Sequence, residues 1–402
     1  MQKSSSISLR LEKIYNLSKK SDLESTNPIY NLNKITDTVN YYTTDAIKDE
    51  NESTDTRVVL NKQYLNFYKV INQLNAQLIY IKSGGYGHTF KGVSFDDDGK
   101  KIVNEFAVKI VAYTKKENYG TIYNTQRPEN SEICMLKILS YFVIKGQTPH
   151  IILPISTFDT KITPFLKLQD KGNIPKDNEN YSKFIKNYKK GLYHDDVSII
   201  ISEWANAGDL SVFLKSHYKK LGLIHWTCIL FQLISTLAII QTKFPEFRHN
   251  DLKPNNILVN KTKTNSAYLY KINKMEYNVP SIGYTIYLID WDFAQIPNIV
   301  DNIKLHQEWT KKLNITSVQN RYYDIHYFFC SLICKGFLPE IMTDPIVPIE
   351  IKNFIDYVLP LEYRPSSKTG YVSEKCRLMV DTEYLLPIDI LKHPLFNCLK
   401  KN

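Results

Sequence analysis

Alternating and helical patterns of apolar residues divide the chain into predicted strands and helices. The clearest alternation covers residues 105–111, where the apolar positions share one face: Phe106, Val108 and Ile110. Because successive strand side chains point to opposite faces, this pattern predicts a strand with Ala107 and Lys109 on the other face. Unbroken apolar runs at 78–81 and 286–289 predict two further strands.

Apolar residues at helical spacing predict helices elsewhere in the chain. A helix within residues 61–77 would pack its apolar side on a neighbouring sheet, and residues 132–139 carry an amphipathic helical pattern. The apolar run 221–240 is nearly long enough to cross a membrane. His225 and Gln232 interrupt that run, so we expect a helix in the core of a folded domain instead.

The remaining segments define the expected domains. Residues 1–60 are rich in Ser, Thr, Asn, Lys and Asp, which predicts a flexible N-terminal tail. The chain has 402 residues, 43% of them hydrophobic, and this is enough to bury the cores of two lobes, at 78–203 and 204–400. Residues 158–196 are loaded with Lys, Asn and Tyr, and we interpret them as an inserted loop.

Composition narrows the partners and the compartment. The net charge of +10 favours acidic partners, but its basic residues are dispersed, and we expect no specific nucleic-acid binding. The six cysteines contain no Cys-x-x-Cys pair, which argues against a disulfide framework and against a zinc site; Cys330 and Cys334 are expected to be buried thiols. The N-terminus lacks an apolar signal core, so we expect a cytoplasmic protein without a transmembrane segment. The oligomeric state stays open.

Two short motifs carry the chemistry. His249–Leu258 places Asp251, Lys253 and Asn256 on one loop, and Asp290 follows a later apolar strand. Phosphoryl transfer requires a group that orients or deprotonates the incoming hydroxyl, a cation near the transferring oxygens, and ligands for Mg²⁺. The four residues can fill these roles in that order. A turn or a helix cap explains each one alone, but their combined order and spacing favour phosphoryl transfer.

A glycine-rich loop upstream would hold the nucleotide phosphates. Glycine lets backbone amides approach phosphate oxygens closely. We therefore assign the four residues of this loop to ATP binding: Gly84, Gly85, Tyr86 and Gly87. Ala107 would leave room for adenine, and Lys109 on the same strand face would reach the phosphates. Such a lysine needs a carboxylate partner. We choose Glu132 for this role, with Glu129 and Glu117 as alternatives.

The order of these motifs, from residue 78 to near the C-terminus, resembles the eukaryotic-type protein kinase family. The resemblance implies an α+β, bilobal fold with a small β-rich N-lobe and a larger helical C-lobe. Ile199–Leu210 is similar to the fifth strand and hinge of the family, which implies ATP contacts for three residues: Glu203, Ala205 and Asp209. Tyr322–His326 resembles the start of the large C-lobe helix, whose Asp324 would brace the catalytic loop.

The finer resemblance is to the serine/threonine branch, because Lys253 stands in a Leu-Lys-Pro segment. It implies ATP with Mg²⁺ or Mn²⁺ as cofactors and proteins with Ser or Thr hydroxyls as substrates. The Asp-Trp-Asp and Tyr-Tyr-Asp-x-His segments are similar to the divergent kinases of poxviruses and other large DNA viruses. That likeness implies a kinase of virion assembly, located in the host cytoplasm or the virion.

Three residues depart from the family pattern. Lys82 replaces the first glycine of the phosphate loop, Asn250 replaces an arginine that holds an activation-loop phosphate in many relatives, and Asp292 replaces the glycine of Asp-Phe-Gly. Asn250 and Asp292 indicate an enzyme that is active without phosphorylation of that loop. Two alternatives stay open: a small-molecule phosphotransferase of the choline and aminoglycoside kinase type, and a pseudokinase scaffold.

Overall fold

The computed structural model describes residues 6–19, 23, 59–84, 86–96, 98–170, 172–263 and 267–401. These residues fall into two compact units, the first within Met1–Ile144 and Ile152–Trp204 and the second within Lys145–Ile151 and Ala205–Asn402. The boundary after Trp204 is one residue from the predicted lobe boundary. The α+β fold class predicted from the motifs is confirmed by the strand-rich first unit and the helix-rich second unit.

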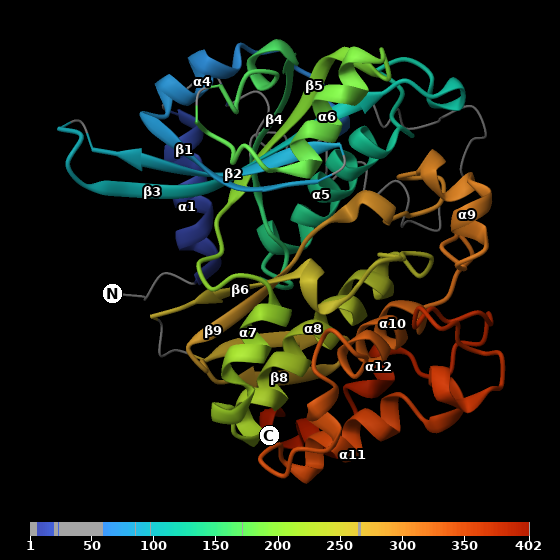
Figure 1. The fold of residues 1–402 in the computed structure, drawn as a ribbon. Coiled ribbons are helices and arrows are strands. Elements are labelled where there is room, and N and C mark those ends of the chain that lie inside the picture. The colour runs from blue at the N-terminus through green and yellow to red at the C-terminus, as the bar shows by residue number, and fades with distance from the viewer. Residues whose placement is uncertain are drawn as a thin grey trace, which may run out of the picture. The chain divides into compact units, whose positions relative to one another are not determined.

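The first unit is built on one antiparallel sheet with the strand order β1-β2-β3-β5-β4 (Figure 1). Its strands are β1 Ala76–Ser83, β2 Gly87–Phe95, β3 Ile102–Thr114, β4 Pro154–Lys161 and β5 Tyr193–Glu203. The alternation predicted for β3 is confirmed, because Phe106, Val108 and Ile110 are fully buried while Ala107 and Lys109 are partly exposed.

Helices cover both faces of this sheet. They are α1 Ser6–Lys19, α4 Phe67–Gln73, α5 Pro128–Ile144 and α6 Glu179–Lys189. His88 of β2 pairs with Ile110, so both point to one face, and the His88 ring packs 4.5 Å from that of Phe184 on α6. Lys109 points to the opposite face and contacts α5, so α5 and α6 lie on opposite sides of β3.

Three predictions about the first unit need correction. Residues 6–19 of the predicted flexible tail form α1, whose Ile14 and Leu17 are buried against the unit. The rest of that tail lies largely outside the described residues. The helix predicted within 61–77 covers only Phe67–Gln73. The predicted inserted loop contains a helix, α6, and its burial of Tyr181 and Phe184 makes it part of the core.

The second unit is organised around α8, Leu223–Lys243. This is the one helix in the described part of the chain that is long and apolar enough to cross a membrane, but 83% of its apolar window is buried inside the protein. The prediction of a core helix is therefore confirmed. The other helices are α7 Leu210–His217, α9 Glu308–Lys311, α10 Tyr323–Leu332, α11 Ile349–Val358 and α12 Pro387–Ile390.

Two short antiparallel ladders complete the second unit. Strand β6 Ile257–Lys261 pairs with β9 Tyr284–Leu288, and β7 Tyr268–Ile272 pairs with β8 Met275–Val279. The β6-β9 ladder matters most for the chemistry, because the loop before β6 and the turn after β9 carry the residues expected to transfer phosphate.

Candidate active site

The catalytic loop candidate runs from the end of α8 to β6 and is braced by Asp324 at the start of α10. The Asp324 carboxylate is fully buried and accepts hydrogen bonds from the backbone nitrogens of His249 at 2.7 Å and Asn250 at 2.9 Å. Asn250 has a φ of 64°, a conformation that costs energy for a residue with a side chain and that these bonds help to hold. The predicted brace is confirmed.

The loop gathers Asp251, Lys253 and Asn256 around one carboxylate. Asp251 Oδ2 accepts hydrogen bonds from Lys253 Nζ at 2.8 Å and from Asn256 Nδ2 at 3.0 Å. Asn256 Nδ2 also donates to the backbone oxygen of Asp251 at 2.9 Å. Both bonds use the amide nitrogen of Asn256, so its Oδ1, the atom suited to bind a hard cation, is outside them.

The other carboxylate oxygen of Asp251, Oδ1, accepts a hydrogen bond that the motifs did not predict. Arg377 Nη2 donates to Asp251 Oδ1 at 2.5 Å, and Arg377 Nη1 donates to the Asn250 backbone oxygen. The guanidinium also lies 3.7 Å from the centre of the Tyr327 ring. Arg377 is far from the catalytic loop in sequence and belongs to no motif, so nothing in the local sequence signals it. Asp251 is thus fixed between two cations.

Asp290 is placed beside Asn256 by the β6-β9 ladder. Ile257 pairs with Leu288 in that ladder, and the Ile289 nitrogen donates to the Asn256 backbone oxygen at 3.1 Å. Asp290 then adopts a left-handed conformation with φ 68° and ψ 69° and starts the short helix Trp291–Phe293. The two residues predicted to bind metal therefore come from neighbouring backbone segments and offer one amide and one carboxylate oxygen.

The first unit forms the predicted lysine–glutamate pair. Lys109 Nζ lies 2.6 Å from Glu132 Oε1, and the Glu132 side chain is only 7% exposed. The alternative Glu129 pairs with Arg127 instead, at 3.3 Å. Burial extends along α5 beyond the expected amphipathic face: Lys137 on this helix is also buried, and burial lowers its pKa to about 8.

The glycine-rich loop has a packing requirement as well as its expected nucleotide role. The Gly84 nitrogen donates to the Gly87 oxygen at 2.8 Å, which closes a tight turn. A Cβ atom added at Gly87 would lie 1.8 Å from the Ile110 oxygen, whereas one at Gly84 would meet open space. Tyr86 between them is exposed. Gly85 lies outside the described residues.

The hinge candidates have side-chain partners of their own within their units. Glu203 at the end of β5 accepts a forked pair of hydrogen bonds from Arg10 of α1, at 2.8 and 2.6 Å, and one from the Leu153 nitrogen at 2.8 Å. Ala205 is buried, and the Asp209 carboxylate caps α7 by accepting from the Val212 nitrogen at 3.0 Å. An adenine contact in this segment would therefore use backbone groups.

Comparisons with known proteins decide the class. The model of the family described as poxvirus serine/threonine protein kinase matches residues 100–364. The chain is 43% identical to the putative serine/threonine-protein kinase R400 of Acanthamoeba polyphaga mimivirus, over 88% of this chain and 76% of that protein. It is 26% identical to serine/threonine-protein kinase 2 of Fowlpox virus, over 67% of this chain and 68% of that protein.

The chain belongs to the poxvirus serine/threonine protein kinase family. This membership makes it a serine/threonine protein kinase with a bilobal α+β fold, as the motifs predicted. It also decides against the small-molecule phosphotransferase that the Asp-Trp-Asp segment left open.

The residues of this kinase that depart from the wider pattern near the catalytic loop are hydrogen bonded. Asn250 Nδ2 donates to the backbone oxygens of Phe293 and Thr316, both at 3.1 Å. The Asp292 carboxylate pairs with Lys304, and its backbone oxygen accepts from Asn302 Nδ2 at 2.9 Å. The Asn250 amide therefore ties the segment after Asp290 to the catalytic loop, whereas the Asp292 contacts lie within that segment.

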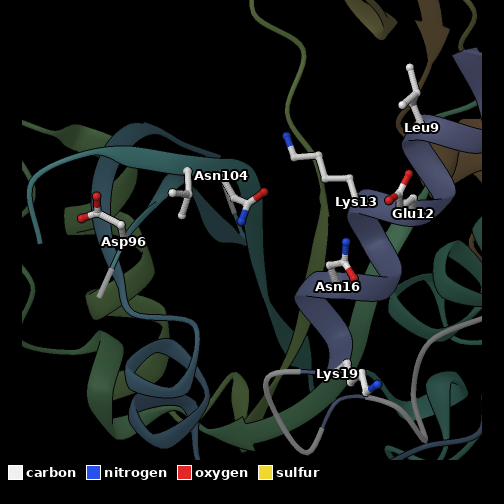
Figure 2. A pocket seen from close by; sticks show the side chains of 8 residues that line it. Leu9, Glu12, Lys13, Asn16, Lys19, Asp96 and Asn104 are labelled. Carbon is white, nitrogen blue, oxygen red and sulfur yellow. The ribbon is translucent and has the colours of Figure 1, made fainter. Parts of the chain in front are cut away.

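The first unit of the kinase also has a cavity beside α1. It has a volume of about 830 Å³ and lies between α1 and the β2–β3 region, which contributes Asp96 and Asn104 to its lining (Figure 2). Its lining includes Glu12, Lys13 and Lys19, so it carries charges of both signs. Among the described residues, none that is assigned to ATP, metal or catalysis lines it.

Proposed function

We propose that this kinase is active and transfers the γ-phosphate of Mg-ATP, or Mn-ATP, to Ser and Thr hydroxyls of proteins. The observation that carries the proposal is the arrangement around Asp251, with Lys253, Asn256 and the Asp290 segment held together by hydrogen bonds. A pseudokinase has no need to keep an ordered carboxylate, cation and amide in one loop.

The proposed roles follow from the chemistry of each group. Asp251 orients the acceptor hydroxyl and receives its proton, and Lys253 neutralises charge on the transferring phosphate. Asn256 Oδ1 and the Asp290 carboxylate are the hard oxygen ligands that Mg²⁺ prefers, and the site therefore fits the metal. Bound Mg²⁺ would neutralise charge on the nucleotide phosphates.

The roles in the first unit concern the nucleotide. Lys109, held by Glu132, would bind the α- and β-phosphates, because an ammonium oriented by a buried carboxylate loses less freedom when it meets an anion. The backbone amides of the loop that contains Gly84 and Gly87 would approach the phosphates, Ala107 would face adenine, and residues 203–205 would offer hinge backbone groups.

We further propose that activity needs no phosphorylation of the segment after Asp290. A phosphate-binding arginine is absent at Asn250, and the amide there already bonds two backbone oxygens of that segment. The viral names of the relatives favour a role in the host cytoplasm or the virion. Mass spectrometry of purified particles would test virion packaging, and absence of the chain from particles would refute it.

The experiment that tests the function is transfer of radiolabel from ATP to mixed protein acceptors, followed by phosphoamino-acid analysis. The wild-type chain should label serine and threonine without prior treatment by another kinase. Asp251→Asn and Lys109→Met should each abolish labelling, and a cooperative unfolding transition in each variant would show that the fold survives the loss of the ion pair. Retained labelling in either variant would refute its role, and Mg-ATP binding without any labelling would favour the pseudokinase.

A further inference from the structure

The second unit contains a cluster of three cysteines outside the proposed active site. Cys330 is on α10, Cys334 follows the end of that helix, and Cys376 is on a turn much later in the chain. Their sulfur atoms all lie within 4.8 Å of one another. Cys330 and Cys376 are buried and Cys334 is partly exposed. Because Cys376 is remote in sequence, the spacing of the cysteines gave no indication of a zinc site.

The separation of the sulfur atoms suits a single metal ion. Thiolates bind Zn²⁺ at about 2.3 Å, so three of them around one ion lie roughly 4 Å apart. Thiolates select soft or borderline ions over Mg²⁺, which prefers oxygen. A metal ion in this cluster would therefore not compete with the ion on the nucleotide.

A buried histidine supplies an independent sign of a ligand. His326 precedes Cys330 by one helical turn, so the two lie on one side of α10, and Cys334 follows two residues beyond its end. His326 Nε2 lies 2.9 Å from the Tyr363 backbone oxygen. Since a carbonyl oxygen only accepts, Nε2 carries the hydrogen and Nδ1 keeps its lone pair.

The lone pair on Nδ1 of His326 has no hydrogen-bond partner among the described residues, and the side chain is fully buried. A buried acceptor without a hydrogen-bond partner is destabilising, which favours a ligand at this atom. Metal-binding histidines commonly donate their other ring hydrogen to a backbone carbonyl, as His326 does to Tyr363. His326 lies outside the group of three sulfurs that are within 4.8 Å of one another, so its ring must move toward them to bind the same ion.

We propose that Cys330, Cys334 and Cys376 bind one thiophilic divalent metal ion of the zinc class. His326 is the fourth ligand, through Nδ1, after a shift of its ring toward the three sulfurs. Binding releases the thiol protons to solvent and changes no oxidation state, so no oxidant or reductant is needed. The proposal does not depend on the proposed function, because metal binding can be measured without any transfer reaction.

The site would act on the catalytic loop through one residue. Cys376 has a φ of 62° in a turn closed by its own nitrogen bonding the Ser373 oxygen at 2.9 Å. The next residue, Arg377, holds the Asp251 carboxylate. A metal bond to Cys376 would fix this strained turn and with it the position of the Arg377 backbone. Arg377 would then be a positioning residue whose order depends on the metal.

The test measures metal on the full chain, purified under reducing conditions and equilibrated with excess Zn²⁺ before desalting. Elemental analysis should find about one zinc per chain, and Co²⁺ loaded in its place should give the intense near-ultraviolet absorption of thiolate coordination. Cys376→Ser and Cys334→Ser should each lose the ion, His326→Gln should bind it more weakly, and Cys398→Ser should retain it. Cys398 is the matched control, because it is exposed and lies outside the cluster.

A second measurement needs no variant and so does not depend on how the variants fold. Zn²⁺ should slow alkylation of the three cluster cysteines in the wild-type chain, as read by mass spectrometry, and leave the rate at Cys398 unchanged. Three results would each overturn the proposal. They are wild-type protein that holds no zinc after loading, equal alkylation rates with and without Zn²⁺, and a disulfide within the cluster of the loaded protein.

Discussion

Replacing Arg377 should show how much the ion pair between Arg377 and Asp251, here called the clamp, contributes to the free energy of unfolding. The Arg377 side chain is 8% exposed and that of Asp251 is 11% exposed, so their ion pair at 2.5 Å is almost fully desolvated. Arg377 also donates to the Asn250 backbone oxygen and to Tyr323 Oη, the latter at 3.3 Å. Breaking a buried pair of this kind costs up to about 3–5 kcal/mol, and because Lys253 still pairs with Asp251 at 2.8 Å, we expect a cost toward the lower end of that range.

The matched control is the pair formed by Arg321 and Glu383. It is also a forked arginine–carboxylate contact in the second unit, with Nη2 to Oε2 at 2.5 Å, but its side chains are 31% and 21% exposed. Solvent screens an exposed pair, so its loss should cost only about 1 kcal/mol. Urea denaturation of Arg377→Gln and Arg321→Gln would give the two free energies of unfolding side by side.

A double-mutant cycle sharpens the test. In an Asp251→Asn background the charge that Arg377 compensates is gone, so Arg377→Gln should cost less stability there than in the wild-type chain. Catalysis should respond as well: a misplaced Asp251 lowers kcat by about 100-fold while the KM for ATP stays nearly constant. If Arg377→Gln costs no more than Arg321→Gln, or if the cycle shows no coupling, the clamp is not what holds Asp251.

Three further predictions concern the first unit. Gly87→Ala should destabilise the protein by several kcal/mol or shift β2 away from Ile110, whereas Gly84→Ala should cost less than about 1 kcal/mol, as measured by thermal unfolding. Burial lowers the pKa of His88 from 6.5 to about 4, so its stability contribution is full above about pH 6.5 and falls by about 2 kcal/mol near pH 5; His88→Gln should remove that part of the pH dependence in urea titrations. Glu132→Gln should raise the KM for ATP more than the analogous change at Glu129, which has a different partner, and equal effects would contradict the assigned pair.

Sequence reasoning succeeded where the signal was local. The alternation in β3 and the apolar run of α8 each occupy one segment, and each segment adopts the expected structure. The choice of Glu132 over Glu129 was open in sequence. It is explained by Arg127, which pairs with Glu129 and leaves Glu132 to Lys109.

The errors have two physical causes. In α1 and α6 the apolar residues are few and polar composition outweighs them, although Tyr181 and Phe184 are spaced for one helix face, as are Ile14 and Leu17. The second cause is the distance along the chain between residues that touch. Arg377 contacts a loop far from it in sequence, and a single sequence has no periodic pattern that predicts such contacts.

The hydrogen bonds of Asn250 explain how the catalytic loop can be held without a phosphate. An arginine at this position would bring a charge into a site where Asn250 is fully buried, and that charge would need an anion to compensate it. The asparagine amide instead donates to the backbone oxygens of Phe293 and Thr316. These oxygens need a hydrogen-bond donor whether or not the segment between them is phosphorylated. Because a neutral amide needs no added charge, these two bonds support the proposal that the loop is held without a modification. Asn250→Ala should therefore lower kcat in the unmodified protein, while phosphatase treatment of the wild-type kinase should leave kcat unchanged; a loss of activity after phosphatase treatment would show that a phosphate supports the loop.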